Sequence, residues 1–180
     1  EQVAFAPSHF VAGVGAAVKK SGRIESFADL DGKTVATTAG STSIQLLRAY
    51  RRNEKADIKE VSGKDTSDAF LMFSSDRAQA LILDDVQLAG LIATSQAPGD
   101  YKILGERLRD EPYGIAYRKD DPKFKELVDQ TLVTIYKSGA INEIYAKWFT
   151  RPIPPKGVNL NFPMTDAIRE IYKNPNANGV

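Results

Sequence analysis

Segments patterned as β-strands alternate with segments patterned as α-helices from Phe10 to Arg118, and only short loops separate them. Ala80–Leu83 is the most informative segment, because it is an uninterrupted apolar run of the kind that a strand covered on both faces requires. Each helix has to carry the chain from one strand to the next. This succession predicts an α/β domain with a mostly parallel sheet and helices on both faces.

Apolar spacing, turn residues and capping residues locate the other elements of this region. Strands are expected at residues 10–19, 33–38, 57–61, 101–104 and 113–118, and helices at 26–30, from 40–43 onward, at 66–74 and at 86–95. Ser26 and Asp65 are the predicted N-caps of the first and third of these helices.

After Lys119 the chain is expected to be mainly helical. A helix begins at Pro122, and its apolar residues keep the spacing of one buried face as far as Ser138–Gly139. A second helix is predicted at 140–149 and a short one at 165–173, with proline-rich extended chain between them. These helices have strong apolar faces and no strands of their own to cover, so we expect them to drive self-association or domain exchange.

Composition excludes several classes of function. Lys plus Arg (24) nearly balance Asp plus Glu (23), and the net charge of +1 gives no field that would favour nucleic acid or an anionic membrane. The chain has no Cys and one histidine, His9, which excludes disulfides, thiolate chemistry and a multi-histidine zinc site within one chain. The longest apolar stretch, Phe10–Val18, is too short to cross a bilayer. We predict neither a metal nor a cofactor.

A candidate anion site lies at Thr38–Ser43, between the end of a predicted strand and the start of a helix. Free backbone N–H groups at a helix N-terminus, with hydroxyl side chains beside them, can hold a carboxylate or a phosphate. A plain Ser/Thr N-cap explains the same residues and, on this evidence alone, is the favoured interpretation.

A candidate cation site lies at Asp84–Asp85, directly after the buried run. Ligands of open α/β sheets bind beyond the carboxyl ends of the strands, so Asp85 is well placed for an ammonium group, while Asp84 is as well explained as a helix cap. Because Ser41–Thr42 and Asp85 both follow strand ends, one edge of the sheet could present an anion site and a cation site to a zwitterion.

Other candidate residues have simpler explanations. His9 has no activated nucleophile beside it, so we interpret it as a structural or surface residue. The four cations Arg48, Arg51, Arg52 and Lys55 are typical of a solvated helix C-terminus. Trp148 with its aromatic neighbours indicates helix packing.

Five ordered motifs, which together span nearly the whole chain, match one family. They are Ser26–Ala36, Gly40–Ser43, Asp84–Asp85, Tyr113–Asp121 and Ile144–Phe149. In this order they resemble the polar amino-acid-binding proteins of bacterial ABC transporters, solute-binding protein family 3. The segments Thr150–Pro155 and Asn159–Phe162 look most like the glutamate/aspartate-binding branch.

The resemblance implies a periplasmic-binding-protein-like type II fold, in which two lobes close on one amino acid. Residues 1–8 resemble the end of the first lobe and a hinge crossing, residues 9–117 a complete Rossmann-like second lobe, and residues 118–180 the return crossing, helices and tail of the first lobe. The N-terminal part of the first lobe has no counterpart, and Glu1–Pro7 shows neither an initiator Met nor a secretory signal. We therefore expect that the chain begins inside a processed or trimmed protein.

The family's ligand contacts carry over to five residues. The resemblance assigns carboxylate contacts to Thr38, Ser41 and Thr42, the α-ammonium to Asp85 and a ligand side-chain contact to Thr66. The glutamate/aspartate branch often has His at the position of Thr66, which is a departure that bears on specificity for acidic ligands.

The implied protein is non-enzymatic, exported to the periplasm and delivers a polar or acidic amino acid to a membrane permease. Tight binding is expected to need the absent part of the first lobe, and the helices after Arg118 are the expected surface for a homo-oligomer.

Two alternatives to this interpretation remain. One is a degenerate fragment that acts only through protein contacts. The other is a magnesium-dependent phosphoacceptor that uses Asp84 and Asp85, although no partner Lys or third carboxylate is evident.

Overall fold

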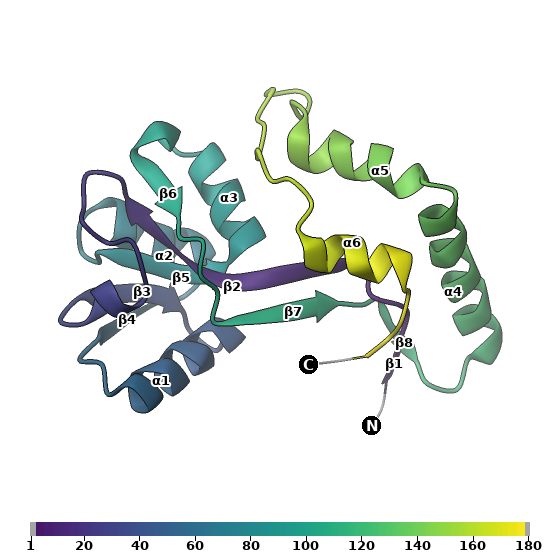
Figure 1. Ribbon diagram of the computed structural model, residues 1–180, viewed down its shortest axis with the longest axis horizontal. Helices are drawn as coiled ribbons and strands as arrows, with labels where there is room; N and C mark the ends of the chain where they lie inside the picture. Colours follow the sequence, from purple (N-terminus) through teal and green to yellow (C-terminus); the bar gives the residue numbers. More distant parts are fainter. Residues whose placement is uncertain (1–2, 179–180) are drawn as a thin grey trace. The chain divides into compact units, whose positions relative to one another are not determined.

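The computed structural model describes residues 3–178 and divides into two compact units (Figure 1). Unit 2 is Gly13–Asp110, and unit 1 combines the described residues up to Ala12 with those from Glu111 onward. Strands β2 (Phe10–Lys19) and β7 (Arg109–Tyr113) both run across the boundary and pair with each other.

The sheet of unit 2 has the strand order β4-β3-β5-β2-β6, with β7 also paired to β2. Its remaining strands are β3 (Thr34–Thr38), β4 (Lys59–Gly63), β5 (Ala80–Asp84) and β6 (Tyr101–Ile103). β3 pairs in parallel with β4 and β5, whereas β2 is antiparallel to β5 and β6. The sheet is therefore mixed, with β2 as the strand that runs against its neighbours.

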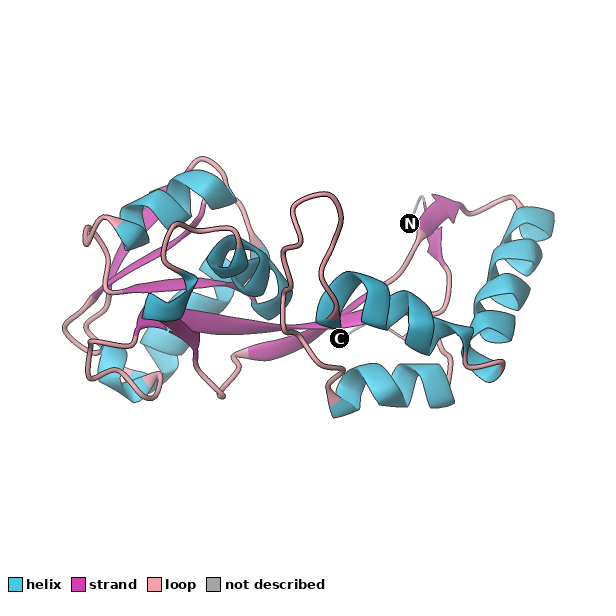
Figure 2. Cartoon of the chain, turned by 90° about the horizontal axis from the view of Figure 1, so that it is seen from above, coloured by secondary structure: helices cyan, strands magenta, loops and turns pink. Residues whose placement is uncertain are grey.

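Helices cover both faces of this sheet (Figures 1 and 2). They are α1 (Thr42–Glu54), α2 (Thr66–Ser74) and α3 (Asp85–Ala93), and short 3-10 turns occur at Ala28–Leu30 and Pro98–Asp100. Alternate residues of β5 point to opposite sides: Ile82 packs in one core cluster with Leu47 of α1, and Leu81 packs in another with Phe73 of α2 and Leu88 of α3. This period of two explains why β5 is apolar throughout.

Unit 1 is built from strands β1 (Val3–Phe5) and β8 (Ala116–Arg118), which pair antiparallel, and from a helical region. The helices are α4 (Pro122–Lys137), α5 (Ala140–Tyr145), the π-turn Ala146–Thr150 and α6 (Asp166–Lys173). α4 contacts both α5 and α6.

Aromatic side chains hold unit 1 together around Phe10. Its ring lies within 6.4 Å, centroid to centroid, of the rings of Tyr113, Tyr145, Phe149 and Phe162. The helix-packing interpretation is therefore confirmed for Tyr145 and Phe149, but not for Trp148, which is 47% exposed.

Two tyrosines fix the segment before Phe10. The hydroxyl of Tyr136 donates to the carbonyl oxygen of Ser8 (3.1 Å), and that of Tyr172 donates to the carbonyl oxygen of His9 (3.0 Å). Burial raises the pKa of Tyr136 to about 12. Burial, with the neighbouring Tyr136, also raises the pKa of Tyr172, so both hydroxyls remain donors throughout the physiological pH range.

The α/β fold predicted from the sequence is confirmed, but the sheet is mixed rather than mostly parallel, because β2 runs antiparallel to β5 and β6. Local elements also differ from the prediction. β4 begins two residues later than expected, and residues 101–118 form three short strands rather than two. Ser26 is not an N-cap, because the 3-10 turn begins after Phe27 and the Ser26 hydroxyl instead donates to Asp29 (2.9 Å). Asp65 is the N-cap of α2, where its side chain accepts from Asp68 N.

The end of β4 lies so close to α2 that only glycine fits at position 63. A Cβ on Gly63 would lie 2.4 Å from the backbone nitrogen of Ala69, and neither backbone can move freely. We expect Gly63→Ala to lower the free energy of unfolding by about 1–3 kcal/mol, measured by urea denaturation. Gly90→Ala is the matched control: position 90 opens onto free space within α3, so a methyl group there should leave stability unchanged or raise it. Equal effects of the two substitutions would contradict this account.

Candidate functional site

The candidate site lies at the edge of unit 2 where the parallel strands end. Thr38, the last residue of β3, is in register with Gly63, the last residue of β4, and Ala39 N donates to Gly63 O (2.9 Å). β5 runs parallel to β3 on its other side. Each of the three strands is followed by a helix, so the N-termini of α1, α2 and α3 emerge at the same edge.

Ser41 is the N-cap of α1. Its hydroxyl donates to Thr38 O (2.7 Å) and accepts from Ile44 N (3.3 Å), so the capping interpretation is confirmed for this residue. Gly40 has φ +75°, a left-handed conformation that makes the tight turn before the cap. Thr42 is the first helical residue and is exposed. A ligand at this terminus would meet the backbone and Thr42 more readily than the Ser41 hydroxyl.

Thr38 and Thr66 place two further hydroxyl groups at this edge. The Thr38 Oγ1 atom is out of contact with solvent and has no hydrogen-bond partner among the described residues. Thr66 is the half-buried first residue of α2. Asp65 caps that helix, since its Oδ1 atom accepts from Asp68 N, and Asp68 Oδ2 accepts from the N–H of Lys64, the residue before the cap.

Asp85 is the most buried charge of the site, with 3% of its surface exposed. Its Oδ1 atom accepts from Gly13 N (3.0 Å) and from Val86 N (2.8 Å). Asp84 occupies the N-cap position of α3, as the capping interpretation expects, but its side chain makes no capping hydrogen bond to that helix.

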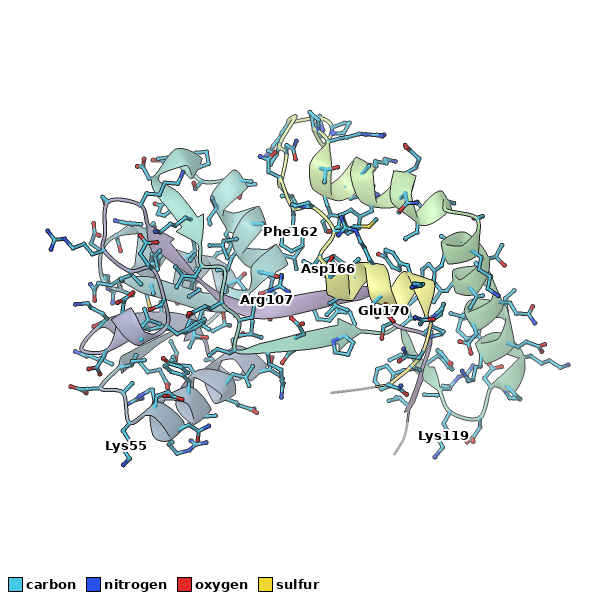
Figure 3. The ribbon with its side chains drawn as sticks, in the orientation of Figure 1. Lys55, Arg107, Lys119, Phe162, Asp166 and Glu170 are labelled. Carbon is cyan, nitrogen blue, oxygen red and sulfur yellow. The ribbon has the colours of Figure 1, made fainter. Side chains whose placement is uncertain are left out.

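The other oxygen of Asp85 faces Arg107, a residue that sequence reasoning missed. Arg107 lies on the loop between β6 and β7 (Figure 3), and its Nη2 atom is 2.8 Å from Asp85 Oδ2. Its Nη1 atom also hydrogen-bonds Asp110 (3.1 Å). The contact with Asp85 is an ion pair without the geometry of a hydrogen bond.

Burial raises the pKa of the Asp85 carboxyl above its ordinary value, and the charge of Asp84 adds to this effect. The Gly13 N–H, the Arg107 guanidinium and the Val86 N–H oppose it, because each stabilises the ionised form. The site therefore contains a carboxylate that is poorly solvated and in need of cations.

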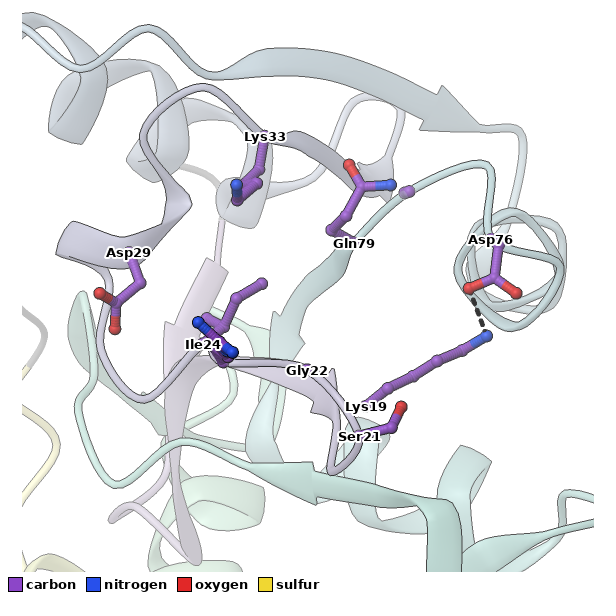
Figure 4. A pocket seen from close by; sticks show the side chains of 10 residues that line it. Lys19, Ser21, Gly22, Ile24, Asp29, Lys33, Asp76 and Gln79 are labelled. Atoms are coloured by element: carbon purple, nitrogen blue, oxygen red, sulfur yellow. Dashed lines mark hydrogen bonds and ion pairs between the residues drawn. The ribbon is translucent and has the colours of Figure 1, made fainter.

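A separate cavity of about 430 Å³ lies at the opposite edge of the same sheet (Figure 4). It is lined by the residues before β3 and β5 and by the end of β2, including Lys33, Gln79 and Lys19. Lys19 forms an ion pair with Asp76 (2.6 Å), and Asp29 accepts from the backbone of residues 25 and 26. Lys19, Asp76 and Asp29 are thus already paired within the protein.

His9 and Arg48 agree with the simpler explanations drawn from the sequence. His9 is half-buried, and burial lowers its pKa. Arg48 on α1 makes a bidentate pair with Glu60 of β4 (2.9 and 2.7 Å) at the protein surface. Within residues 3–178, no helix is long and apolar enough to cross a membrane, and no group of three or more His, Cys, Asp or Glu side chains is placed to hold a metal ion.

Residues 1–151 match the family model of bacterial extracellular solute-binding proteins, family 3. The L-glutamate/L-aspartate-binding protein of Pseudomonas aeruginosa is 42% identical over 97% of this chain, and the glutamate/aspartate import solute-binding protein of Escherichia coli is 40% identical over 98%. The chain spans 58% of the length of each of these relatives.

The fold has a counterpart among solved structures. An ancestral arginine-binding protein bound to arginine superposes with a TM-score of 0.68 at 35% sequence identity. The similarity covers 82% of this chain and 64% of that protein.

The raised pKa of Asp85 predicts a pH dependence of stability. The folded state holds the Asp85 proton more tightly than the unfolded state. The contribution of Asp85 to stability is therefore fully present below the ordinary pKa of 3.8 and is lost as pH rises through the folded pKa. The free energy of unfolding of the wild type, minus that of Asp85→Asn, should therefore decrease over this window by at most about 1.4 kcal/mol per pH unit. Urea denaturation across pH tests this, and a difference that increases with pH would contradict it.

Proposed function

The chain belongs to family 3 of the bacterial extracellular solute-binding proteins, and we propose that it carries one half of an amino-acid site in a protein that serves an ABC transporter. The ligand would be a polar or acidic amino acid, and a membrane permease would receive it. The role is one of binding without catalysis, and it is exercised in the periplasm. The family model and the two glutamate/aspartate-binding relatives support this assignment.

The observation that carries the proposal is the pairing of a buried acid with helix N-termini at one edge. Asp85 offers a negative charge that needs a cation, and the α1 N-terminus offers N–H groups that favour an anion. An amino acid carries both charges, so its ammonium group would lie at Asp85 and its α-carboxylate at Thr38, Ser41 and Thr42. The unpartnered Thr38 hydroxyl is a donor suited to that carboxylate.

The relatives favour an acidic ligand, and glutamate or aspartate is our first choice. Thr66 would lie near the ligand side chain, at the start of α2. A threonine hydroxyl can donate to a carboxylate or to an amide, so this position admits glutamate and neutral polar amino acids alike.

Binding by this chain alone is expected to be weak. Micromolar affinity requires about 8 kcal/mol, whereas a helix-end contact contributes about 0.3–2 kcal/mol and a charge-assisted hydrogen bond about 1.5–3 kcal/mol. Association also loses translational and rotational freedom. We propose that tight binding needs additional polypeptide, of the kind that makes up the rest of the relatives' length.

Unit 1 exposes apolar side chains that such polypeptide would cover. Phe124 and Leu127 of α4 are 45% and 63% exposed, and Ile144 and Trp148 are 45% and 47% exposed. In this chain by itself, the same surface is open to a second copy.

Removal of the Asp85 charge tests the ligand site. Nuclear magnetic resonance titration of the ¹⁵N-labelled chain with L-glutamate should move amide signals at Gly40–Thr42 and Val86, with a dissociation constant in the millimolar range. Asp85→Asn should weaken this binding about tenfold or more, because a charge-assisted hydrogen bond is lost.

Asp57→Asn is the matched control for this titration. Asp57 is exposed and precedes β4, at the opposite edge of the sheet, so the same isosteric change there should leave glutamate binding unaltered. Micromolar affinity of the monomeric chain would contradict the need for additional polypeptide. No shift with any amino acid would contradict the ligand site and favour a role through protein contacts alone.

The exposed face of unit 1 predicts self-association. Sedimentation velocity should show oligomers that increase with protein concentration, and Leu127→Glu should shift the equilibrium toward the monomer because it places a charge on this face. Leu71→Glu is the matched control, since Leu71 of α2 is similarly exposed (60%) but belongs to unit 2. A wild-type chain that remains monomeric at every concentration would refute this prediction.

A further inference from the structure

We propose that Arg107 is a tethered competitor for the ligand: its guanidinium occupies the place at Asp85 that the ammonium group of the amino acid would take. Ligand binding is then an exchange of one cation for another. This inference rests on the proposed function, because it concerns the same carboxylate.

One of the two carboxylate oxygens of Asp85 is already hydrogen-bonded to the protein backbone. Oδ1 accepts from two backbone N–H groups, those of Gly13 and Val86, and these bonds hold the carboxylate in one orientation. Oδ2 is the oxygen left for a mobile cation, and Arg107 Nη2 lies 2.8 Å from it. Oδ2 is out of contact with solvent, so an incoming ammonium group would have to displace Arg107 to reach it.

The loop that carries Arg107 is anchored on both sides. Leu104 N donates to Ala16 O (2.9 Å) and Leu108 N donates to Val14 O (2.7 Å), so both ends of the loop are fixed to β2. Within the loop, Glu106 Oε2 accepts from Phe27 N (2.8 Å). The backbone of residue 107 is thus held near Asp85, while the side chain retains its own rotational freedom.

The strand opposite makes room for the guanidinium. A Cβ on Gly13 would lie 2.3 Å from Arg107 Cδ and 2.4 Å from Nε, so the side chain lies directly over the bare backbone of β2. Glycine in a strand interior commonly marks such a close approach. The position of Arg107 therefore depends on the absence of a side chain at Gly13.

The charges allow the exchange. Arg107 lies between two carboxylates, since it hydrogen-bonds Asp110 through Nη1 and pairs with Asp85 through Nη2. With 29% of its side chain exposed, Arg107 can leave Asp85 for solvent and still neutralise Asp110. A ligand that has carboxylates but no ammonium group gains nothing from this departure.

The test compares L-glutamate with glutarate, which has both carboxylates and no amine. Both are titrated into the ¹⁵N-labelled 180-residue chain, as wild type and as Arg107→Gln, and the dissociation constants are measured by nuclear magnetic resonance. We expect Arg107→Gln to strengthen glutamate binding about two- to fivefold, the range of a partly exposed ion pair, and to leave glutarate binding unchanged or weaker. Arg77→Gln makes the same change in net charge at an exposed position and should alter neither affinity.

Gly13→Ala is an independent variant that keeps the charge of Arg107 and displaces its side chain, so it should also strengthen glutamate binding. Equal or weaker glutamate binding in both variants, with binding to the wild type intact, would overturn the competitor role alone. Absence of glutamate binding in the wild type and in both variants would overturn the proposed function as well. Parallel gains for glutamate and glutarate would overturn the competitor role, since they would show a general effect on anions.

Discussion

Parallel pairing of β3 with β4 and β5 is the constraint on which the rest of the structure depends. It places the carboxyl ends of three consecutive strands at one edge of the sheet. Each of these strands is followed by a helix whose N-terminus lies at that edge. The N–H groups of these helix ends and the acid at the start of α3 are therefore gathered by backbone hydrogen bonds rather than by side-chain contacts. Residues nearly fifty positions apart along the chain, such as Thr38 and Asp85, come to share one edge in this way.

A buried charge is the second organising element. Asp85 is almost inaccessible to water, and an unpaired carboxylate in such a place would be costly. The protein offsets the cost with two backbone donors and one arginine. In the site we propose, the arginine is the partner that a ligand cation would replace, and it would thereby set the affinity for that ligand.

Unit 1 is stabilised by side-chain contacts rather than by the pairing of parallel strands. Aromatic rings gathered around Phe10 and two tyrosine hydroxyls hold the early residues to the later helices, so segments more than 100 residues apart in sequence form one core. The exposed side chains of α4 and α5 show that this core leaves apolar surface uncovered. The two observations agree with a chain that spans 58% of the length of its solute-binding relatives.

The sequence by itself determined the α/β pattern, the caps at Ser41 and Asp65 and the family, because these depend on local spacing and on short motifs. It also indicated Asp85, since an acid directly after a buried strand stands at a predictable edge. Only the tertiary structure decided that β2 runs antiparallel, that the Asp84 side chain makes no capping hydrogen bond, and that Arg107 faces Asp85. Gly13, a glycine within a strand, was a signal that another group comes close to the backbone there. A glycine does not identify which side chain that is. Such partners are far apart along the chain, and only folding brings them together.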